Sequence, residues 1–339
     1  MKKISLIFAV LAAVMLMAVS CANTKTDENK GGAVEGKVDT TVASVVNVGA
    51  LKGPTGMGLV KLMEDSGNVS DSDFVYDFTL DSAADMIVTK ITKGELDIAA
   101  VPANLASILY NRLEGDIVVL NINTLGVLYI AENGESVKTV EDLRGKKIYA
   151  SGKGNTPEYA LNYMLEAYGL VPGVDVLVEY KTEHAECLAA ILAEENSVAM
   201  LPQPFVTNAT MQNSGVRIAL DINAEWEAKT GKQHVTGVTI ARKSFVESNP
   251  EAVKTFLDGY KASVEYVNNN VADAAQLIEK HGIFKAAVAE KALPKCSISY
   301  IDGAEMKQIL SEYLVILSGQ NPQAVGGALP GDDFYYTAE

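Results

Sequence analysis

Cysteine, histidine and tryptophan are the residues this sequence has least of, with three, three and one among its 339 residues. No second Cys or His pair accompanies His184 and Cys187 to complete a zinc site, and no serine occupies the glycine-flanked position of a hydrolase nucleophile. We therefore expect no metal, no cofactor and no catalysis. Cys187 and Cys296 permit one disulfide without requiring it, and the Ala- and Leu-rich surroundings of Cys187 predict a buried thiol.

Basic residues are also few, because 28 Lys and Arg face 43 Asp and Glu and leave a net charge of −15 at pH 7. An acidic surface is repelled by phosphate backbones and by anionic membrane surfaces. We therefore exclude nucleic acid as a partner. The composition, 48% hydrophobic and 21% charged, is that of a globular chain long enough for one large or two medium domains.

The first twenty residues differ from the rest. Lys2 and Lys3 precede an uncharged apolar run at residues 4–19, and small residues follow it before Cys21. This order is typical of an export signal rather than of a core helix. We expect the mature protein to lie outside the cytoplasm.

Residues 18–21, AVSC, resemble the bacterial lipobox, whose cysteine is acylated and becomes the new N-terminus. The stretch that follows is polar and typical of a flexible tether. We expect a lipoprotein signal peptide at 1–20, a lipid on Cys21 that anchors the protein to the cell membrane, and a tether at 21–40. A plain cleaved signal or a lone transmembrane anchor is the alternative.

Residues 45–63 begin the folded part with a strand, a glycine-rich turn and a helix. The Val-rich run at 45–50 predicts a buried strand, and apolar residues recur at helical spacing from Leu59. The turn at 52–58 would place backbone N–H groups and the positive end of a helix dipole at the carboxyl edge of a sheet, where open α/β folds bind ligands. It is a predicted wall of a binding site.

This pattern continues through the first part of the chain. Strands are predicted at 73–80 and 96–101, with a helix at 83–92 that Ser82 can cap. Short links between strands and helices indicate a parallel sheet with right-handed crossovers. The run at 117–130 predicts two strands, one ending the first lobe and one starting elsewhere.

The pattern then repeats. A strand at 147–150 leads into the glycine-rich turn at 151–156, and Thr156 suits the N-cap of the next helix. A helix at 184–193 and a strand at 197–201 follow. The second series therefore has the order of the first.

The C-terminal third is predicted to be mostly helical. A strand at 237–241 could carry the chain back to the first lobe, and helices are predicted from Asn249, at 271–281 and at 304–317. Aromatic residues in the tail at 326–336 could pin it to the body.

Together, these features resemble the type II periplasmic binding proteins of ABC transporters, in the nitrate, sulfonate and taurine family that includes thiamine-pyrimidine binders. The resemblance covers essentially the whole mature chain, and no single motif carries it alone. The segments that carry it are the lipobox, VGALKGPTGMG, GELDIAAVP, VEDLRGKKIYASGKGNTPEY, MLPQPFV and NPEAVKTFLDGYKASVEYV.

The resemblance implies an α/β fold of two lobes, each a mainly parallel sheet flanked by helices, with a ligand cleft between them that closes on binding. It also implies a membrane permease and its ATPase as partners. The predicted division is lobe one at 41–124, lobe two at 125–235, and the second part of lobe one with the C-terminal helices at 236–339.

Four strand-to-helix turns face the predicted cleft: 52–58 and 102–104 in lobe one, 151–156 and 202–203 in lobe two. Each can offer backbone N–H groups and polar side chains. A histidine just before the return strand could reach the cleft from the hinge. For each residue the alternative is a cap, a turn or a core position, and the joint pattern favours a site. The candidate ligand-binding residues are Gly53, Thr55, Gly56, Met57, Asn104, Ser151, Asn155, Thr156, Gln203 and His234.

The sequence leaves two ligand classes open. Helix N-termini favour a small anion such as an alkyl sulfonate, whereas Met57, Phe205 and Trp226 leave room for a planar heterocycle. The similar family often has an acidic residue where Gln203 stands, so a neutral residue there argues against a cationic ligand.

We therefore expect a lipid-anchored, monomeric solute-binding protein that closes on a small organic ligand and delivers it to an ABC permease and ATPase. A ligand sensor for a membrane receptor is one alternative. An enzyme on the same fold, as in the pyrimidine-synthesising relatives, is another, and the export signal argues against it.

Overall fold

A computed structural model describes residues 44–66 and 74–337. The predicted signal peptide, the lipid on Cys21 and the tether lie outside these residues and stay predictions. Within the described ranges, every helix is too short or too polar to cross a bilayer.

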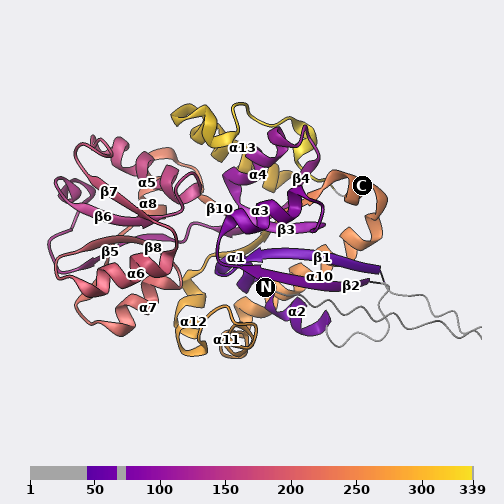
Figure 1. Cartoon of the computed structure of the whole chain (residues 1–339), viewed down its shortest axis with the longest axis horizontal. Helices are drawn as coiled ribbons and strands as arrows, with labels where there is room; N and C mark the ends of the chain where they lie inside the picture. Colours follow the sequence, from indigo (N-terminus) through magenta and orange to yellow (C-terminus); the bar gives the residue numbers. More distant parts are fainter. Residues whose placement is uncertain (1–43, 67–73, 338–339) are drawn as a thin grey trace, which may run out of the picture. The chain divides into compact units, whose positions relative to one another are not determined.

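The first sheet has six strands and forms the centre of lobe one (Figure 1). Its strands are β1 (Ser44–Leu51), β2 (Phe74–Asp81), β3 (Ile98–Pro102), β4 (Ile117–Leu125), β10 (Val235–Arg242) and β11 (Ile298–Ile301). They are ordered β11-β4-β10-β3-β1-β2. β1 runs parallel to β2 and β3, whereas β10 is antiparallel to both of its neighbours.

The second sheet has five strands and forms lobe two. Its strands are β5 (Leu128–Asn133), β6 (Lys147–Ser151), β7 (Leu177–Lys181), β8 (Val198–Pro202) and β9 (Val216–Asp221). They are ordered β7-β6-β8-β5-β9, with β5 antiparallel to both neighbours. This order matches β2-β1-β3-β10-β4 of the first sheet strand for strand, so the repeat predicted from the sequence is confirmed.

Helices cover both faces of each sheet. In lobe one, the helices are α1 (Pro54–Met57), α2 (Val60–Ser66), α3 (Ala84–Thr92), α4 (Ala103–Arg112), α9 (Lys243–Ser248), α10 (Pro250–Asn269), α11 (Val271–Lys280), α12 (Ala286–Ala292) and α13 (Gly303–Gln320). In lobe two they are α5 (Thr156–Ala167), α6 (His184–Ala193), α7 (Phe205–Gln212) and α8 (Ile222–Thr230). Figure 1 shows α5 and α8 on one face of the second sheet and α6 and α7 on the other.

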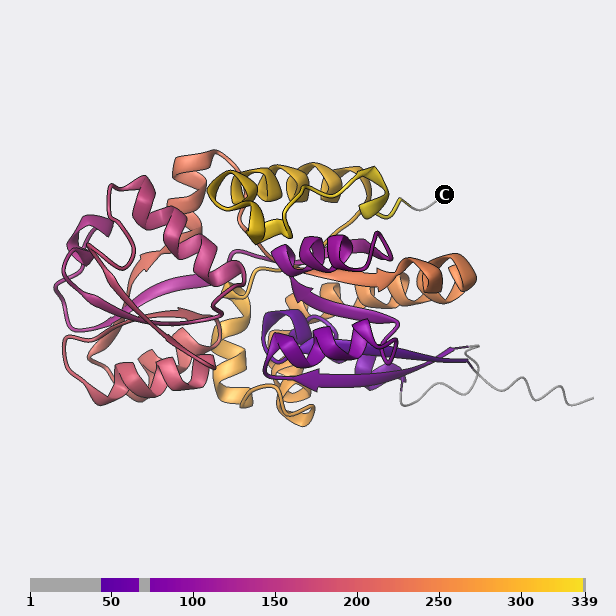
Figure 2. The same cartoon turned by 45° about the horizontal axis from the view of Figure 1, so that its top comes forward.

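Strand β3 shows why the central strands are apolar at successive positions. Ile98 and Ala100 face the core beneath α2 and α10, whereas Ala99 and Val101 face the core beneath α4 and α13. A strand covered on both faces needs apolar residues at every position. In Figure 2, the yellow helix α13 lies beside α4 over this second core.

The chain crosses between the lobes twice, and Asn223 at the start of α8 ties the crossings together. Its Nδ2 donates to the carbonyl of Leu128 at 3.2 Å, and its Oδ1 lies 3.0 Å from Nδ1 of His234. A Cβ on Gly126 would lie 2.2 Å from Oδ1 of Asn223. Only glycine therefore fits at the first crossing.

Most predicted elements are confirmed, the helix at 184–193 to the residue and the return strand as β10 in the first sheet. The tail is pinned as expected, since Phe334 is buried and the Tyr336 N–H donates to the Val119 carbonyl. Cys187 is a buried free thiol.

Two predicted caps are wrong. Ser82 does not cap α3, whose N-cap residue is Ala83 and has no side-chain cap bond. Thr156 is the first residue of α5 rather than its N-cap, because Asn155 holds that position. The elements α7, α8, α9, α12 and β11 were not predicted, because no clear apolar period stands out in these short segments.

Candidate functional site

A cavity of about 100 Å³ lies where the two lobes meet, and all four predicted turns contribute to it. Both crossing segments complete the wall. Its lining residues are Leu51, Lys52, Gly53, Pro54, Thr55, Pro102, Val127, Leu128, Thr156, Pro157, His184, Pro202, Gln203, Phe205 and Thr236. Of the ten candidate residues, Gly53, Thr55, Thr156 and Gln203 are thus brought together here.

The turn after β1 is shaped by residues with special backbone properties. Gly53 has φ 148°, a conformation that glycine adopts readily, and Pro54 begins α1 where a helix has no use for the missing N–H. The Thr55 hydroxyl donates to the Leu51 carbonyl at 3.2 Å. A Cβ on Gly56 would lie 2.6 Å from that same oxygen, so Gly56 closes the turn.

The turn after β8 presents Gln203, which is fully buried. Its backbone N–H donates to the Val127 carbonyl at 3.0 Å, and its Oε1 accepts from the Thr207 hydroxyl at 2.7 Å. These bonds fix the amide, and Nε2 makes no hydrogen bond. Burial raises the pKa of Tyr129 to about 12, an effect that the nearby Gln203 amide opposes.

Asn104 is buried and joins the lobes instead of lining the cavity. Its Oδ1 accepts from the Thr156 hydroxyl at 3.1 Å, and its Nδ2 lies 3.3 Å from the carbonyl of Gly154 and 3.2 Å from that of Ala324. The Thr156 hydroxyl therefore forms a hydrogen bond across the two lobes. The pair places polar contacts between the starts of α4 and α5, directly beside the cavity.

A second cavity of about 290 Å³ adjoins the first and shares Leu51, Pro102, Pro157 and His184 with it. Ser151 and Asn155 line this second space. Two further candidate residues thus lie in the same cleft.

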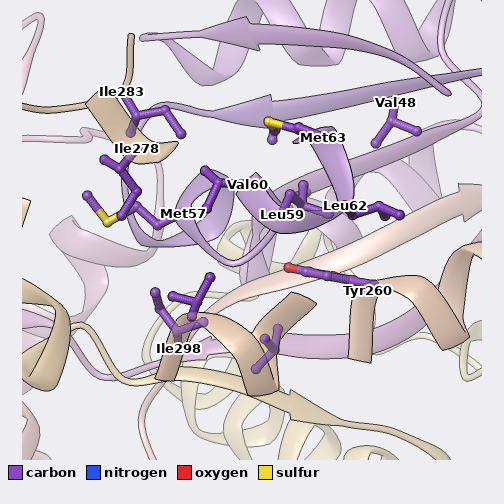
Figure 3. Packing of buried hydrophobic residues seen from close by; sticks show 14 of the residues in the cluster. Val48, Met57, Leu59, Val60, Leu62, Met63, Tyr260, Ile278, Ile283 and Ile298 are labelled. Atoms are coloured by element: carbon purple, nitrogen blue, oxygen red, sulfur yellow. The ribbon is translucent and has the colours of Figure 1, made fainter. Parts of the chain in front are cut away.

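Met57 and His234 lie away from both cavities. Met57 is fully buried in the core of lobe one, near Val60 and Ile278 (Figure 3). His234 packs against Trp226 and Tyr313, with ring centroids 5.3 and 5.7 Å away. Burial lowers the pKa of His234 to about 3, so the ring is neutral at pH 7.

His184 is a cleft residue that the sequence analysis did not place there. It begins α6, its Nδ1 lies 2.5 Å from the Ser151 Oγ, and its ring centroid lies 5.4 Å from that of Phe205. Loss of hydration lowers its pKa to about 4, which keeps it neutral. The sequence does contain a signal for His184, because the turn after β7 is a fifth strand-to-helix turn. It is equivalent to the turn after β2 in lobe one.

The side chains at this cleft suit reversible binding. In the described part of the chain, His, Cys, Asp and Glu nowhere gather in the threes that a metal ion needs. The cavity of about 100 Å³ instead offers hydroxyl, amide and neutral imidazole groups within a mainly apolar wall. Such walls hold small molecules through shape and a few oriented hydrogen bonds. The adjoining cavity adds the charged side chains of Asp85, Lys153, Lys181 and Glu183.

Comparison with known proteins agrees with this geometry. Residues 117–274 match a family described as NMT1/THI5 like. A crystal structure of an ABC transporter from Parabacteroides distasonis is 25% identical, with a TM-score of 0.73 over 87% of this chain and 100% of that chain. The chain thus resembles the NMT1/THI5-like family over residues 117–274 and has the fold of the periplasmic binding proteins. The two-lobed type II fold expected from the sequence is confirmed, and the expected resemblance to substrate-binding proteins of ABC transporters is supported.

Two more distant structures share the fold of this chain. The periplasmic aliphatic sulphonate binding protein SsuA from Escherichia coli is 18% identical, with a TM-score of 0.70 over 88% of this chain and 94% of its own. The Candida albicans CA3427 gene product, described as having the generic periplasmic binding protein fold, is 15% identical, with a TM-score of 0.58 over 86% and 93%. Curated proteins gave no match.

Proposed function

We propose that this protein captures a small organic molecule between its lobes and delivers it to an ABC importer. The observation that carries the proposal is the cavity lined by turns of both sheets and by both crossing segments. A ligand held there contacts both lobes at once, so it stabilises the closed arrangement over the open one. An importer can then recognise the loaded protein by its closed form.

Two further points support delivery to an importer. The similar structures from Parabacteroides distasonis and Escherichia coli are described as an ABC transporter and a periplasmic binding protein. The N-terminal sequence, with its lipobox-like cysteine, is suited to holding such a receptor at the outer face of the cell membrane. In this proposal Cys21 carries the lipid and the protein acts as a binding protein without turnover.

The binding proposal is tested by thermal unfolding of the mature protein with a panel of sulfonates, carboxylates, nucleobases and vitamin precursors. A ligand at a hundred times its Kd stabilises the folded state by about 2.7 kcal/mol, which raises Tm by about 5 °C for a chain of this length. Mass spectrometry of copurified ligand identifies it directly. Absence of any shift across the panel would contradict the proposal, and chemical alteration of the ligand would favour an enzyme.

The site is tested with one variant from each lobe. Thr55→Val removes a hydroxyl from lobe one, and Gln203→Leu removes an amide from lobe two. Each is expected to weaken ligand binding while the ligand-free protein stays folded. Gln308→Leu, at an exposed position of α13, is the matched control and should bind as the wild type does.

The anchor is tested separately by Cys21→Ser in the full chain. We expect the wild-type protein to partition with membranes and the variant to lose that association. Equal partitioning of the two would contradict lipidation at Cys21 and leave the cleft proposal untouched.

A further inference from the structure

We propose that the cleft selects an uncharged molecule with an apolar body and at least one hydrogen-bond acceptor, and that Gln203 and Thr236 recognise the polar part. This inference rests on the proposed function and extends it by specifying the charge of the ligand. It decides between the two ligand classes that the sequence left open.

The composition of the cavity wall is the first argument. Of the residues that line the cavity of about 100 Å³, Lys52 alone carries a charge at pH 7, and its side chain is exposed to solvent. The wall is otherwise dominated by prolines and apolar side chains. An anion that enters such a wall gives up its hydration and needs a buried positive partner in return. Arginine, the usual partner of sulfonates and carboxylates, is absent from both cavity linings. The adjoining cavity has Lys153 and Lys181, but Asp85 and Glu183 line it as well and offset their charge.

The helix N-termini of lobe two are the second argument, because carboxylates of the protein already occupy them. The Gly154 N–H donates to Oε2 of Glu158 at 2.6 Å, in the turn before α5. The Thr182 N–H donates to Oε2 of Glu186 at 2.8 Å, in the turn before α6. Each carboxylate satisfies a donor and offsets the positive end of the helix dipole. A second anion beside them would meet negative charge.

Lobe one offers little more to an anion. Pro54 has no N–H, and the N–H groups of Gly56 and Met57 both donate to the Gly53 carbonyl. Of the first residues of α1, only Thr55 has an N–H that these two hydrogen bonds do not use. Glycine and proline therefore allow a ligand to approach the backbone of this turn closely, but they provide few N–H groups that could bind an anion.

Two buried polar atoms in the cavity wall still need partners. Nε2 of Gln203 and Oγ1 of Thr236 are buried and make no hydrogen bond of normal length and angle, although the Tyr129 hydroxyl lies near the Gln203 amide. The Thr207 hydroxyl donates to Oε1 of Gln203, and this assigns the unpartnered end of the amide as the donor. An amide N–H and a hydroxyl both suit an uncharged acceptor such as a carbonyl or a ring nitrogen. Buried polar groups without partners are rare in folded proteins, so a ligand that supplies the partner is a physical reason for them.

His184 is consistent with the same conclusion. Its lowered pKa keeps the ring neutral, so it adds an aromatic surface next to Phe205 and no positive charge. Around the cavity of about 100 Å³, the polar groups of Thr55, Thr156, Gln203 and His184 are all neutral.

The experiment compares probes that share one skeleton and differ in charge: a pyridine ring bearing a carboxamide, a carboxylate or an aminomethyl group, and benzenesulfonamide against benzenesulfonate. Binding is measured by thermal shift and calorimetry on the mature protein at two salt concentrations. We expect the uncharged member of a set to bind at least tenfold more tightly than its charged partners, with no dependence on salt. Tighter binding of the carboxylate or sulfonate overturns the inference and leaves the proposed function standing. No binding by any probe or by the wider panel instead removes the proposed function.

Two variants test the named residues. Gln203→Glu keeps the shape of the side chain but replaces the donor with a negatively charged oxygen. We expect this variant to bind the uncharged probe at least tenfold more weakly and to bind the aminomethyl probe more tightly than the wild type does. Thr236→Val removes only the unpartnered hydroxyl, so the ligand-free protein should unfold at or above the wild-type temperature while binding falls several-fold. The control is Gln308→Glu on the exposed face of α13. An unchanged order of affinities in Gln203→Glu overturns the assignment of that residue.

Discussion

Burial of His234 makes the stability of the protein sensitive to mild acid, and the size of the effect follows from its pKa. His234 is 3% exposed, and burial lowers its pKa from 6.5 to about 3. The unfolded chain therefore binds a proton below pH 6.5 that the folded protein does not bind. The contribution of the neutral, buried His234 to the free energy of unfolding is fully present above pH 6.5 and is lost as the pH falls toward 3. At pH 5 the loss from this one residue is about 2 kcal/mol.

The assay is urea unfolding followed by the fluorescence of Trp226, the single tryptophan, whose ring lies 5.3 Å from that of His234. The variant His234→Asn keeps a donor near the Nδ1 position, which contacts Oδ1 of Asn223. We expect the variant to be less stable at pH 7.5, because it loses ring packing. Between pH 7.5 and 5, however, it should lose about 2 kcal/mol less than the wild type.

His281 is the matched control, since it is only partly buried and the nearby Glu64 opposes the lowering of its pKa by lost hydration. The His281→Asn variant should retain most of the wild-type pH dependence. Equal pH dependence in the wild type and in His234→Asn would refute the reasoning, because the buried ring would then not account for the proton uptake on unfolding.

Three further outcomes are expected. Gly126→Ala should destabilise the protein by about 2 kcal/mol in urea unfolding, because its Cβ would collide with Asn223 at 2.2 Å, and a wild-type midpoint would contradict that contact. Asn104→Ala removes hydrogen bonds between the lobes and should lower Tm and cost about 2–3 kcal/mol, whereas Asn269→Ala, at an exposed position, should do neither. Cys187, buried and with its pKa raised to about 11, should resist iodoacetamide at pH 8 until the protein unfolds, and rapid native labelling would disprove its burial.

The fold was largely predictable because its signals are local. The β3 run is apolar at successive positions since both of its faces are covered, and glycine and proline mark the turn before α1. The order of strands and short turns then leaves few topologies. The match between β2-β1-β3-β10-β4 and β7-β6-β8-β5-β9 follows from the same order.

The site was less predictable because its contacts are distant in sequence. Thr156 is of a residue type that often caps helices, but its hydroxyl donates a hydrogen bond to Asn104, which lies 52 residues away in the sequence. Met57 sits in the predicted turn, yet the short α1 turns its side chain into the core. His184 carries no local signal of a ligand site, and only the equivalence of β7 with β2 places it in the cleft.

The central claim is that one ligand contacts both lobes in the cleft, and a crystal structure of the protein with its copurified ligand tests it most directly. We predict that the ligand fills the cavity between the turns at Thr55 and Gln203, with an uncharged acceptor toward Nε2 of Gln203 and Oγ1 of Thr236. A ligand bound elsewhere, or one that touches a single lobe, would contradict the account.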